Sequence, residues 1–437
     1  MHSPSSPRRA DALVLFGITG DLGTSKLIPA LVELCRSDRL DGVPVVGVGR
    51  RQRSDEEFRQ LVAAATDSTG ADLVNRLELR YVSGDAAKIG TFDEIANILQ
   101  QAVRPVIYAA LPPAVFGDAA RAIASSRMPD DVRFVVEKPF GSDAATACEL
   151  HDEMVSSLGE HKLLVVDHFL AKASVENLLT VRTSNALLDR VLDRQSVARV
   201  AIELRERGDV ANRGSFYEQV GVVDDVVQNH LIQLAALALM ERPADDSDKA
   251  YHEARATVIE SMSVLSDSVV LGQYDGYRGH DDVADDSQVA TFCSFTMHVD
   301  TDRWRGVPIG VVTGKALDET STSVTFELDG PGANSVRFGI KPDPTISIGL
   351  DILDTDSEHR EHREPSLRRV EAQLCGPSKH EELGDYATLL DDALGQSSRH
   401  FAQIDDIVAG WRIVSGITIR GAEPCVYEPG SRGPVTR

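Results

Sequence analysis

Apolar and polar residues alternate along the first third of the chain in blocks that change period. Short apolar runs at 12–16, 44–48, 104–111, 132–137 and 163–166 predict buried strands. The stretches 22–34 and 54–65 between them carry apolar residues at helical spacing. Strands that alternate with helices are typical of βαβ units, so this part is expected to form a parallel sheet covered by helices.

The rest of the chain follows a different order. Helices are predicted over 174–189 and 221–240, and strand-like runs then follow one another at 268–271, 289–299, 323–328, 335–340 and 345–350. A further helix is expected within 386–413. This order predicts an α+β domain with a large, mainly antiparallel sheet. The expected organisation is therefore a flexible tail over 1–10, a first domain over 11–168, a second over 169–420, and an irregular tail over 421–437.

Length and charge narrow the class of protein. A chain of 437 residues with 42% hydrophobic and 26% charged residues is expected to form at least two globular domains. It has 68 acidic and 45 basic residues, a net charge of −23, which argues against nucleic acid or an anionic membrane as partner. An anionic ligand would need a local group of cations, for which the candidates are Lys26, Arg50, Arg51, Lys138, Lys172 and Lys315.

The cysteines and the hydropathy of the sequence indicate where in the cell the protein is expected. Five scattered cysteines show neither a disulfide framework nor the spacing of a metal site, so no metal is expected. No run of about 18 apolar residues predicts a membrane span, and the first ten residues do not have the pattern of a secretory signal. The expected location is the cytoplasm.

A glycine-rich turn lies between the first strand and the first helix. Gly17, Gly20 and Gly23 have the spacing G-x-x-G-x-x-G, which departs from the common dinucleotide pattern G-x-G-x-x-G. Its position before a helix N-terminus favours binding of a pyrophosphate, because unpaired backbone N–H groups point at the ligand there. The alternative is a plain turn between a strand and a helix.

The second strand indicates which dinucleotide is bound. An NAD site usually has an acidic residue at this strand end to bind the ribose hydroxyl. Here Arg50 and Arg51 follow the strand, and a guanidinium suits the 2′-phosphate of NADP. The alternative is a pair of solvated arginines on a surface loop.

Ionisable residues gather after the strand at 163–166. Asp167, His168 and Lys172 follow it within six positions, at the end of a strand where open α/β sheets bind ligands. The carboxylate can orient a histidine base, and the imidazole and ammonium can bind an anion. A strand followed by a solvated helix start remains the alternative.

Two further segments carry weaker signals. Val223, Val227, His230 and Leu234 follow helical spacing, which places His230 on an apolar stripe, and polar residues Asp225, Gln228 and Asn229 lie beside it. A lone histidine on such a stripe is usually a core residue. However, the polar neighbours need partners, which a ligand pocket would provide. Gly314 and Lys315 follow a later apolar strand, where the glycine would permit close backbone approach.

Together these residues resemble the glucose-6-phosphate dehydrogenase family. The matching segments are Phe16-Gly17-Ile18-Thr19-Gly20-Asp21-Leu22, Glu137-Lys138-Pro139-Phe140-Gly141, Asp167-His168-Phe169-Leu170-Ala171-Lys172, Arg213-Gly214, Gln228-Asn229-His230, Arg303-Trp304-Arg305-Gly306-Val307-Pro308 and Thr313-Gly314-Lys315-Ala316-Leu317. They occur in the family's order and extend over residues 12–413.

The resemblance implies a reaction, oxidation of glucose 6-phosphate at C1 by NADP, and a role for each matching residue. His230 matches the general base and Asp167 the carboxylate that orients it. His168 and Lys172 match phosphate ligands, and Lys138, Glu206, Asp225 and Lys315 match other substrate contacts. The implied cofactor contacts are Gly17, Thr19, Gly20, Asp21, Leu22, Lys26, Arg50 and Lys138. Pro139 matches a proline that follows a cis peptide, and a homodimer or homotetramer is implied, with the dimer formed through the large sheet.

The chain also departs from the family pattern. The motif Asp-His-Tyr-Leu-Gly-Lys has Phe169 and Ala171 here, so a hydroxyl that helps to bind phosphate is absent. Thr320 stands where the family commonly has a basic residue. These changes leave two other hypotheses open: a paralogue that oxidises a different sugar or sugar phosphate, and a non-catalytic, ligand-sensing subunit with the same fold.

Overall fold

The computed structural model describes residues 9–66, 71–330, 332, 334–353, 367–375, 383–418 and 423–434. The chain forms two compact units. Unit one comprises Met1–Ala173, Asp245–His252 and Glu381–Val408, and unit two comprises Ser174–Ala244, Glu253–His380 and Ala409–Arg437. Segments 245–252 and 381–408 therefore lie in unit one, although the sequence placed both in the second domain.

Unit one contains a seven-stranded sheet in the order β16-β6-β5-β4-β1-β2-β3. Its strands are β1 (Ala12–Phe16), β2 (Val45–Gly49), β3 (Leu79–Ser83), β4 (Pro105–Ala109), β5 (Arg133–Val136), β6 (Leu163–Val166) and β16 (Phe401–Ala402). The first six pair in parallel and β16 pairs antiparallel to β6. The order 3-2-1-4-5-6 is that of dinucleotide-binding domains, which confirms the predicted Rossmann-type fold.

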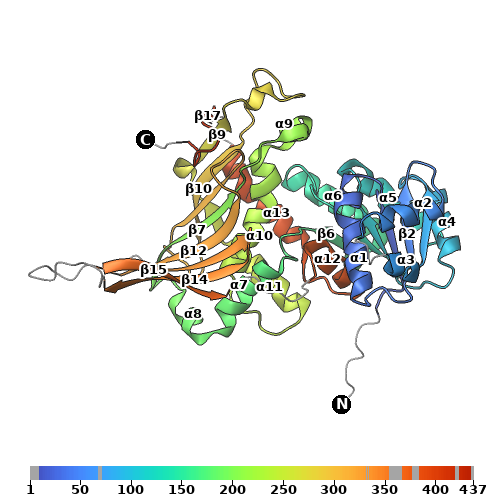
Figure 1. Ribbon diagram of the computed structural model, residues 1–437, viewed down its shortest axis with the longest axis horizontal. Coiled ribbons are helices and arrows are strands. Elements are labelled where there is room, and N and C mark those ends of the chain that lie inside the picture. The colour runs from blue at the N-terminus through green and yellow to red at the C-terminus, as the bar shows by residue number, and fades with distance from the viewer. Residues whose placement is uncertain are drawn as a thin grey trace, which may run out of the picture. The chain divides into compact units, whose positions relative to one another are not determined.

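Helices lie along this sheet in unit one (Figure 1). They are η1 (Gly23–Leu27), α1 (Ile28–Arg36), α2 (Asp55–Ala63), α3 (Ala71–Arg76), α4 (Ile89–Ile98), η2 (Pro113–Val115), α5 (Phe116–Ser125), α6 (Ala144–Leu158), η3 (Glu160–Lys162) and α12 (Asp385–Leu394). Helix α2 begins at a capping box, in which Ser54 and Glu57 each accept a backbone N–H of the other. Strands β1, β2, β4 and β5 are buried along their whole length, which explains their unbroken apolar runs.

Unit two contains a ten-stranded sheet in the order β15-β14-β13-β12-β7-β11-β10-β9-β17, with β8 also paired to β10. The strands are β7 (Val197–Arg205), β8 (Met262–Val264), β9 (Val270–Tyr274), β10 (Phe292–Val299), β11 (Ile309–Gly314), β12 (Ser321–Leu328), β13 (Ser335–Lys341), β14 (Thr345–Leu353), β15 (Leu367–Cys375) and β17 (Cys425–Tyr427). Only β7 with β11 and β9 with β17 pair in parallel, so the predicted mainly antiparallel sheet is confirmed.

The remaining helices divide the three helical stretches that the sequence predicted and add others that it did not predict. They are α7 (Ala173–Ser184), α8 (Ala186–Val191), η4 (Ala211–Arg213), α9 (Gly214–Val222), η5 (Val223–Leu231), α10 (Ile232–Leu239), α11 (Asp248–Glu260), η6 (Ser266–Ser268), η7 (Tyr277–Gly279) and α13 (Ile404–Thr418). The helix expected over 174–189 breaks at Asn185. The helix expected over 221–240 is formed by η5 and α10 and begins at Val223, because its first expected residue, Gly221, is non-helical with φ +57°. The stretch 386–413 is interrupted by strand β16. No helix among the described residues is long and apolar enough to span a bilayer.

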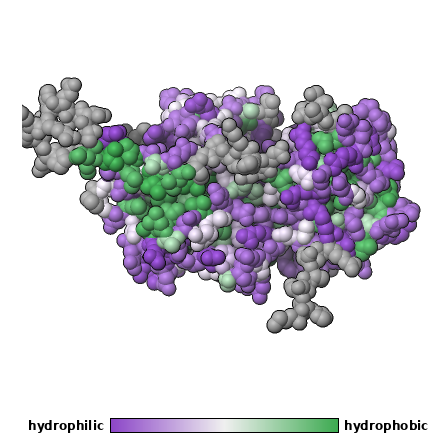
Figure 2. Space-filling model, turned by 60° about the horizontal axis from the view of Figure 1, so that its bottom comes forward, coloured by the Kyte–Doolittle hydropathy of each residue, from purple (hydrophilic) through white to green (hydrophobic). Residues whose placement is uncertain are grey.

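One end of the large sheet exposes apolar side chains. Leu350, Ile352 and Leu353 of β14 and Leu367 and Leu374 of β15 have 38–65% of their surface exposed. Figure 2 shows hydrophobic residues gathered over this end of the sheet. Exposed apolar patches of this kind are uncommon on monomeric soluble proteins.

Candidate active site

The glycine-rich turn of unit one leaves no room for side chains. Gly17 has φ +73°, and a β-carbon there would lie 2.1 Å from the carbonyl oxygen of Ala110. A β-carbon on Gly23 would lie 2.3 Å from the carbonyl oxygen of Ile18, so the first helical turn packs directly on the loop. Gly17 and Gly20 are joined by a backbone hydrogen bond of 2.9 Å. The turn therefore requires glycine at Gly17 and Gly23, because neighbouring backbone atoms occupy the space of a β-carbon.

The residues expected to bind the adenosine phosphate lie at the same edge of the sheet. Arg50 follows β2 directly and is exposed. Thr19 lies nearby, because a β-carbon on Gly49 would be 3.2 Å from its hydroxyl oxygen. Lys26 is exposed in the last turn of η1. Arg51 lies next to Arg50, and its carbonyl accepts hydrogen bonds from neighbouring side chains.

Lys138 follows β5 within the Glu137-Lys138-Pro139 segment. The Lys138–Pro139 peptide is cis, as the resemblance implied. The carboxylate of Glu137 is buried and accepts a hydrogen bond from the Tyr108 hydroxyl at 2.5 Å. Burial raises the pKa of Glu137. The sequence analysis assigned no role to Glu137 or Tyr108, although the charge of Lys138 acts on the Glu137 carboxylate.

The Asp167–Lys172 segment forms a tight turn after β6. Asp167 is 2% exposed, and its Oδ1 accepts the backbone N–H of Phe169 at 3.0 Å. This side-chain turn fixes the carboxylate at the carboxyl end of the strand. Phe169 is buried and lies beneath the ammonium of Lys172, which is 5.3 Å from the ring centre. The turn thus sets Asp167, His168 and Lys172 at one strand end, as predicted.

Two residues that the sequence analysis missed contact this segment from helix α12. Lys172 forms an ion pair with Asp385, and the ring of His168 stacks on Tyr386 with 5.9 Å between centroids and a 19° interplanar angle. Burial raises the pKa of Tyr386. The negative charges of Glu137, Asp385 and Asp167 raise it further. No local pattern could have revealed these contacts, because 213 residues separate Lys172 from Asp385 along the chain.

In unit two, the parallel pairing of β7 and β11 brings two candidate residues together. Gly314 lies opposite Arg205, so Glu206 and Lys315 follow at neighbouring strand ends. The ammonium of Lys315 is 2.5 Å from Oε2 of Glu206 and 5.5 Å from the ring centre of Tyr217. The close approach expected at Gly314 is made by the Phe292 ring, 2.9 Å from where a β-carbon would lie. Gly314 is therefore explained by packing.

Asp225 belongs to the same surroundings. Burial raises the pKa of the Tyr217 hydroxyl, and the charges of Asp225 and Glu206 add to this effect. The Tyr217 ring is fully buried, so it forms a rigid wall beside Lys315. Glu206, Asp225 and Lys315 therefore form one polar group in unit two, and Tyr217 is the residue that sequence reasoning missed.

His230 lies on a π-helix, not on an α-helix. Element η5 has π-type geometry, in which backbone hydrogen bonds join residues five positions apart. Asp225 and His230 are five positions apart, so the π-helical turn brings them toward one face. His230 is 6% exposed, and its backbone N–H donates to Oδ1 of Asn229 at 2.6 Å. All four members of the predicted stripe, Val223, Val227, His230 and Leu234, are buried, as the spacing indicated.

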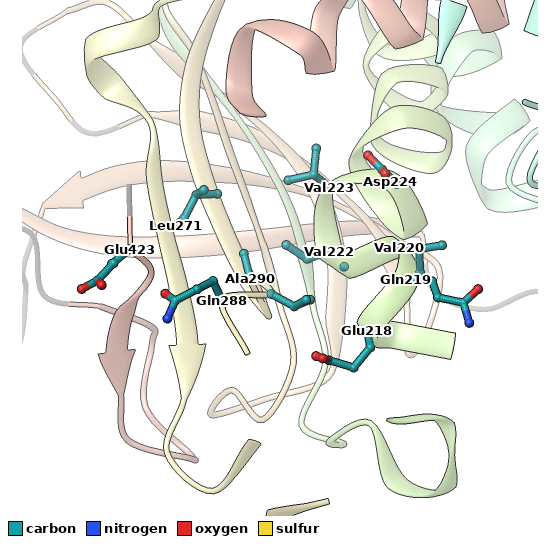
Figure 3. A pocket seen from close by; sticks show the side chains of 12 residues that line it. Glu218, Gln219, Val220, Val222, Val223, Asp224, Leu271, Gln288, Ala290 and Glu423 are labelled. Carbon is teal, nitrogen blue, oxygen red and sulfur yellow. The ribbon is translucent and has the colours of Figure 1, made fainter. Parts of the chain in front are cut away.

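A cavity of about 440 Å³ lies at the junction of α9 and η5. It is lined by Glu218, Gln219, Val220, Gly221, Val222, Val223, Asp224, Leu271, Gln288, Val289, Ala290 and Glu423 (Figure 3). None of the candidate site residues lines it. Burial raises the pKa of Asp224 to about 6, and this is the notable electrostatic feature of the cavity wall.

The Arg303–Pro308 segment has a structural role. The indole N–H of Trp304 donates to the Leu239 carbonyl at 2.6 Å, and its ring stacks on Phe326. Arg303 forms ion pairs with Asp189 and Glu241. These contacts fasten the loop to α10 and α8, so the segment supports the fold of unit two and contributes no group to the candidate site.

Comparison with known proteins assigns the family. Residues 14–177 match the model "Glucose-6-phosphate dehydrogenase, NAD binding domain", and residues 179–437 match "Glucose-6-phosphate dehydrogenase, C-terminal domain". The chain belongs to the glucose-6-phosphate dehydrogenase family. It is 35% identical to glucose-6-phosphate 1-dehydrogenase 1 of Mycobacterium tuberculosis, over 97% of this chain and 93% of that protein. The resemblance found in the motifs is thereby confirmed.

Solved structures agree with this assignment. The chain is similar to a glucose-6-phosphate 1-dehydrogenase from Mycobacterium avium, with a TM-score of 0.88 and 32% identity over 98% of this chain and 96% of that one. It is also similar to a glucose-6-phosphate dehydrogenase in complex with glucose 6-phosphate, with a TM-score of 0.90 and 25% identity over 99% of this chain and 97% of that one. The two-domain fold of the family is therefore present throughout.

The departures from the glucose-6-phosphate dehydrogenase pattern now have positions in the fold. Phe169 and Ala171 are both buried within the turn after β6. Thr320 is exposed, and its hydroxyl accepts the backbone N–H of Arg207 at 3.0 Å. The guanidinium of Arg207 donates instead to the carbonyl oxygen of Asp318, two residues before Thr320.

Proposed function

We propose that this chain oxidises glucose 6-phosphate at C1 to 6-phosphogluconolactone, with NADP as the oxidant. The match of both family domains along the chain, with every candidate active-site residue present, is the observation that carries the proposal. When bound, NADP would supply the hydride acceptor for C1, and a base of the chain takes the proton of the C1 hydroxyl.

His230 acts as the base and Asp167 orients its imidazole. The support is the family motif together with the burial of both side chains, which excludes water that would compete for the proton. The backbone N–H held by Oδ1 of Asp167 fixes the carboxylate in one orientation. Asp167 also stabilises the imidazolium that forms when the proton arrives.

The sugar is held by cations at strand ends of each unit. His168, Lys172 and Lys138 bind the phosphate side of the substrate, and Lys315, Glu206 and Asp225 bind its hydroxyl groups. The support is that Lys138, His168 and Lys172 follow β5 and β6 at the carboxyl edge of the parallel sheet, where such sheets bind ligands. In unit two, Glu206 and Lys315 follow β7 and β11 and form an ion pair. A pocket in a chain of net charge −23 needs these cations to attract an anion at all.

The turn at Gly17 lies between β1 and the helix that begins at Gly23, where the backbone N–H groups of dinucleotide-binding domains meet a pyrophosphate. Gly17, Thr19, Gly20, Asp21 and Leu22 would hold the cofactor there, with Lys26 and Lys138 nearby. Arg50 is exposed at the end of β2, where a 2′-phosphate is expected.

Replacing Arg50 by alanine should therefore weaken NADP binding and leave NAD binding almost unchanged. One charge-assisted bidentate contact contributes about 1.5–3 kcal/mol, which corresponds to roughly one to two powers of ten in affinity. Fluorescence titration with NADPH and NADH measures both constants. The control is Arg80→Ala, which removes an exposed guanidinium paired with Asp55 in the same unit. Equal weakening of both cofactors would mean that Arg50 has a structural role and that selectivity lies elsewhere.

An absorbance assay of NADPH formation decides among the three hypotheses for this fold. Turnover of glucose 6-phosphate above all other sugars and sugar phosphates supports the proposal. Preference for another sugar or sugar phosphate would identify the protein as a paralogue. Phe169 and Thr320, which depart from the family pattern, are the reason for this alternative. Binding without turnover of any sugar phosphate would identify a ligand-sensing subunit.

We further propose that the chain forms a homodimer, or a tetramer made of such dimers, through the apolar end of the large sheet. The exposed leucines of β14 and β15 support this, since a monomer gains nothing from leaving them in water. Light scattering should give at least twice the chain mass, and Leu353→Lys with Leu367→Lys should reduce it. A wild type that stays monomeric at micromolar concentration contradicts the proposal.

We also propose a cytoplasmic location, as in the relative named "Glucose-6-phosphate 1-dehydrogenase 6, cytoplasmic" from Arabidopsis thaliana.

A further inference from the structure

The first two residues of helix α12 contact two of the proposed phosphate ligands of unit one, Lys172 and His168. Asp385 forms an ion pair with Lys172, and Tyr386 stacks on His168. The ion pair is partly buried, with 22% of the Lys172 side chain and 32% of the Asp385 side chain exposed. Partial burial reduces screening by water, so the carboxylate acts strongly on the ammonium.

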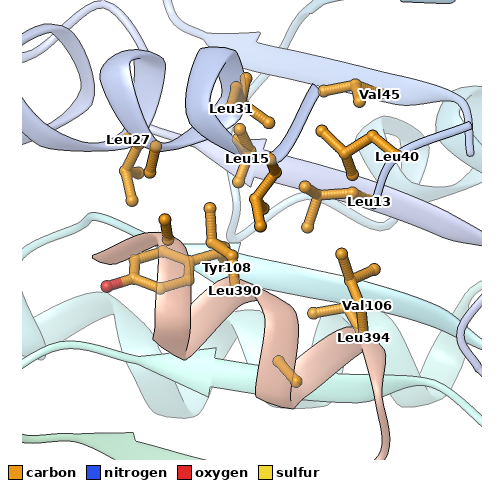
Figure 4. Close-up of a cluster of buried hydrophobic side chains, with 14 of the residues drawn as sticks. Leu13, Leu15, Leu27, Leu31, Leu40, Val45, Val106, Tyr108, Leu390 and Leu394 are labelled. Carbon is orange, nitrogen blue, oxygen red and sulfur yellow. The ribbon is translucent and has the colours of Figure 1, made fainter. Parts of the chain in front are cut away.

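The core of unit one fixes the position of Asp385. Leu390 and Leu394 of α12 pack against Leu13, Leu15 and Tyr108 (Figure 4). Ala387, Leu389 and Ala393 of the same helix are also buried in this cluster. Since α12 is anchored along its apolar face, its first turn cannot swing away freely, and Asp385 remains beside Lys172.

The electrostatic effect of Asp385 opposes phosphate binding. The Asp167–Lys172 segment contains one permanently charged cation, the ammonium of Lys172, and this ammonium is already paired with the carboxylate of Asp385. The carboxylates of Glu137 and Asp167 also raise the pKa of Tyr386, the stacking partner of His168. A phosphate dianion must displace Asp385 from Lys172 or bind next to it. Either route makes binding weaker than it would be at an unpaired lysine.

We propose that Asp385 is a specificity-determining residue that weakens binding of the substrate's phosphate group. It thereby reduces the preference for glucose 6-phosphate over sugars without a phosphate. The inference rests on the proposed function, because it takes Lys172 as a phosphate ligand. Asp385 acts through Lys172 and is therefore a positioning residue. Its effect should appear in the Michaelis constant for the phosphorylated substrate and not in turnover.

The test is steady-state kinetics of Asp385→Asn with glucose 6-phosphate and with glucose, at saturating NADP. Asparagine keeps the size of the side chain and removes its charge. The KM for glucose 6-phosphate should fall about tenfold, since a charged hydrogen-bond partner is released for the substrate. The turnover number and the kcat/KM for glucose should change less than twofold. The inhibition constant of inorganic phosphate against glucose 6-phosphate should fall with the KM.

The matched control is Asp118→Asn. Asp118 lies on α5 of the same unit, is half exposed and forms an ion pair with Arg121, so the substitution changes the net charge equally. Its KM for glucose 6-phosphate should stay within twofold of wild type. Asp385→Ser serves as a second variant that retains a polar group at the start of α12, in case asparagine impairs folding.

The two proposals fail in different ways. If the wild type oxidises glucose 6-phosphate and Asp385→Asn leaves its KM unchanged or raises it, the role of Asp385 is overturned and the proposed function stands. If the wild type does not oxidise glucose 6-phosphate, the proposed function fails. Calorimetric titration with inorganic phosphate then decides the role of Asp385: tighter binding to the variant supports it, and equal binding overturns it.

Discussion

The His230→Asn enzyme should lose turnover by a factor of about 10² to 10⁴ while it still binds glucose 6-phosphate within a few-fold of wild type. A general base acts mainly in the transition state, so its removal lowers kcat far more than ground-state binding. Asparagine is smaller than histidine and polar, so it should be accommodated in the buried position on η5. Steady-state kinetics gives kcat, and calorimetric titration gives the dissociation constant of the sugar phosphate.

The control for this variant is His161→Asn. His161 is exposed in η3 of unit one and is not a candidate site residue, so its replacement should change kcat less than twofold. The primary isotope effect with glucose 6-phosphate deuterated at C1 should rise in His230→Asn, because bond breaking at C1 becomes rate-limiting. Near-normal turnover in His230→Asn would show that another group takes the proton.

The Asp167→Asn enzyme should be slowed on the order of ten- to a hundredfold, which is less than the loss at His230, because an orienting group is removed and the base remains. The local fold should survive, since the amide oxygen of asparagine can still accept the backbone N–H of Phe169. The stabilising charge on the imidazolium is lost. We therefore expect kcat to fall and the KM for glucose 6-phosphate to stay within about twofold.

Asp85 provides a matched control for this substitution. It follows β3 in the same sheet, and its Oδ1 accepts the backbone N–H of Ala87 at 2.9 Å, which reproduces the turn made by Asp167. Asp85→Asn should leave kcat unchanged. A loss in Asp167→Asn that appears only in KM would assign Asp167 to substrate binding, and an equal loss in both aspartate variants would point to a general effect on the turn.

Most of the site could be predicted because its residues follow strands directly. In a parallel sheet the strand ends meet at one edge, so Gly17, Arg50, Lys138 and Asp167 could be assigned to a common region from their order alone. The parallel pairing of β7 and β11 likewise aligns Glu206 with Lys315. The sequence missed this pairing, because β7 was not predicted as a strand.

Helix geometry was harder to predict than strand position. An apolar stripe at α-helical spacing placed His230 among buried residues, and this is confirmed. The spacing could not show that the segment is π-helical, because burial patterns for the two geometries differ little over two turns. The consequence is chemical, since only a π-turn brings Asp225 and His230 toward one face.

The fold class, the glycine turn and the local order of acidic and basic groups could be predicted from the amino-acid sequence alone, because they depend on short-range periodicity and on residue chemistry. The partners of those groups depend on tertiary structure. Asp385 and Tyr386 come from a segment more than 200 residues away, and the apolar face of α12 carries them to Lys172 and His168. The packing of a buried hydrophobic face therefore determines which carboxylate forms the ion pair with the proposed phosphate-binding lysine. Because the hydrophobic effect is non-directional, no short-range sequence pattern indicates which element such a face will pack against.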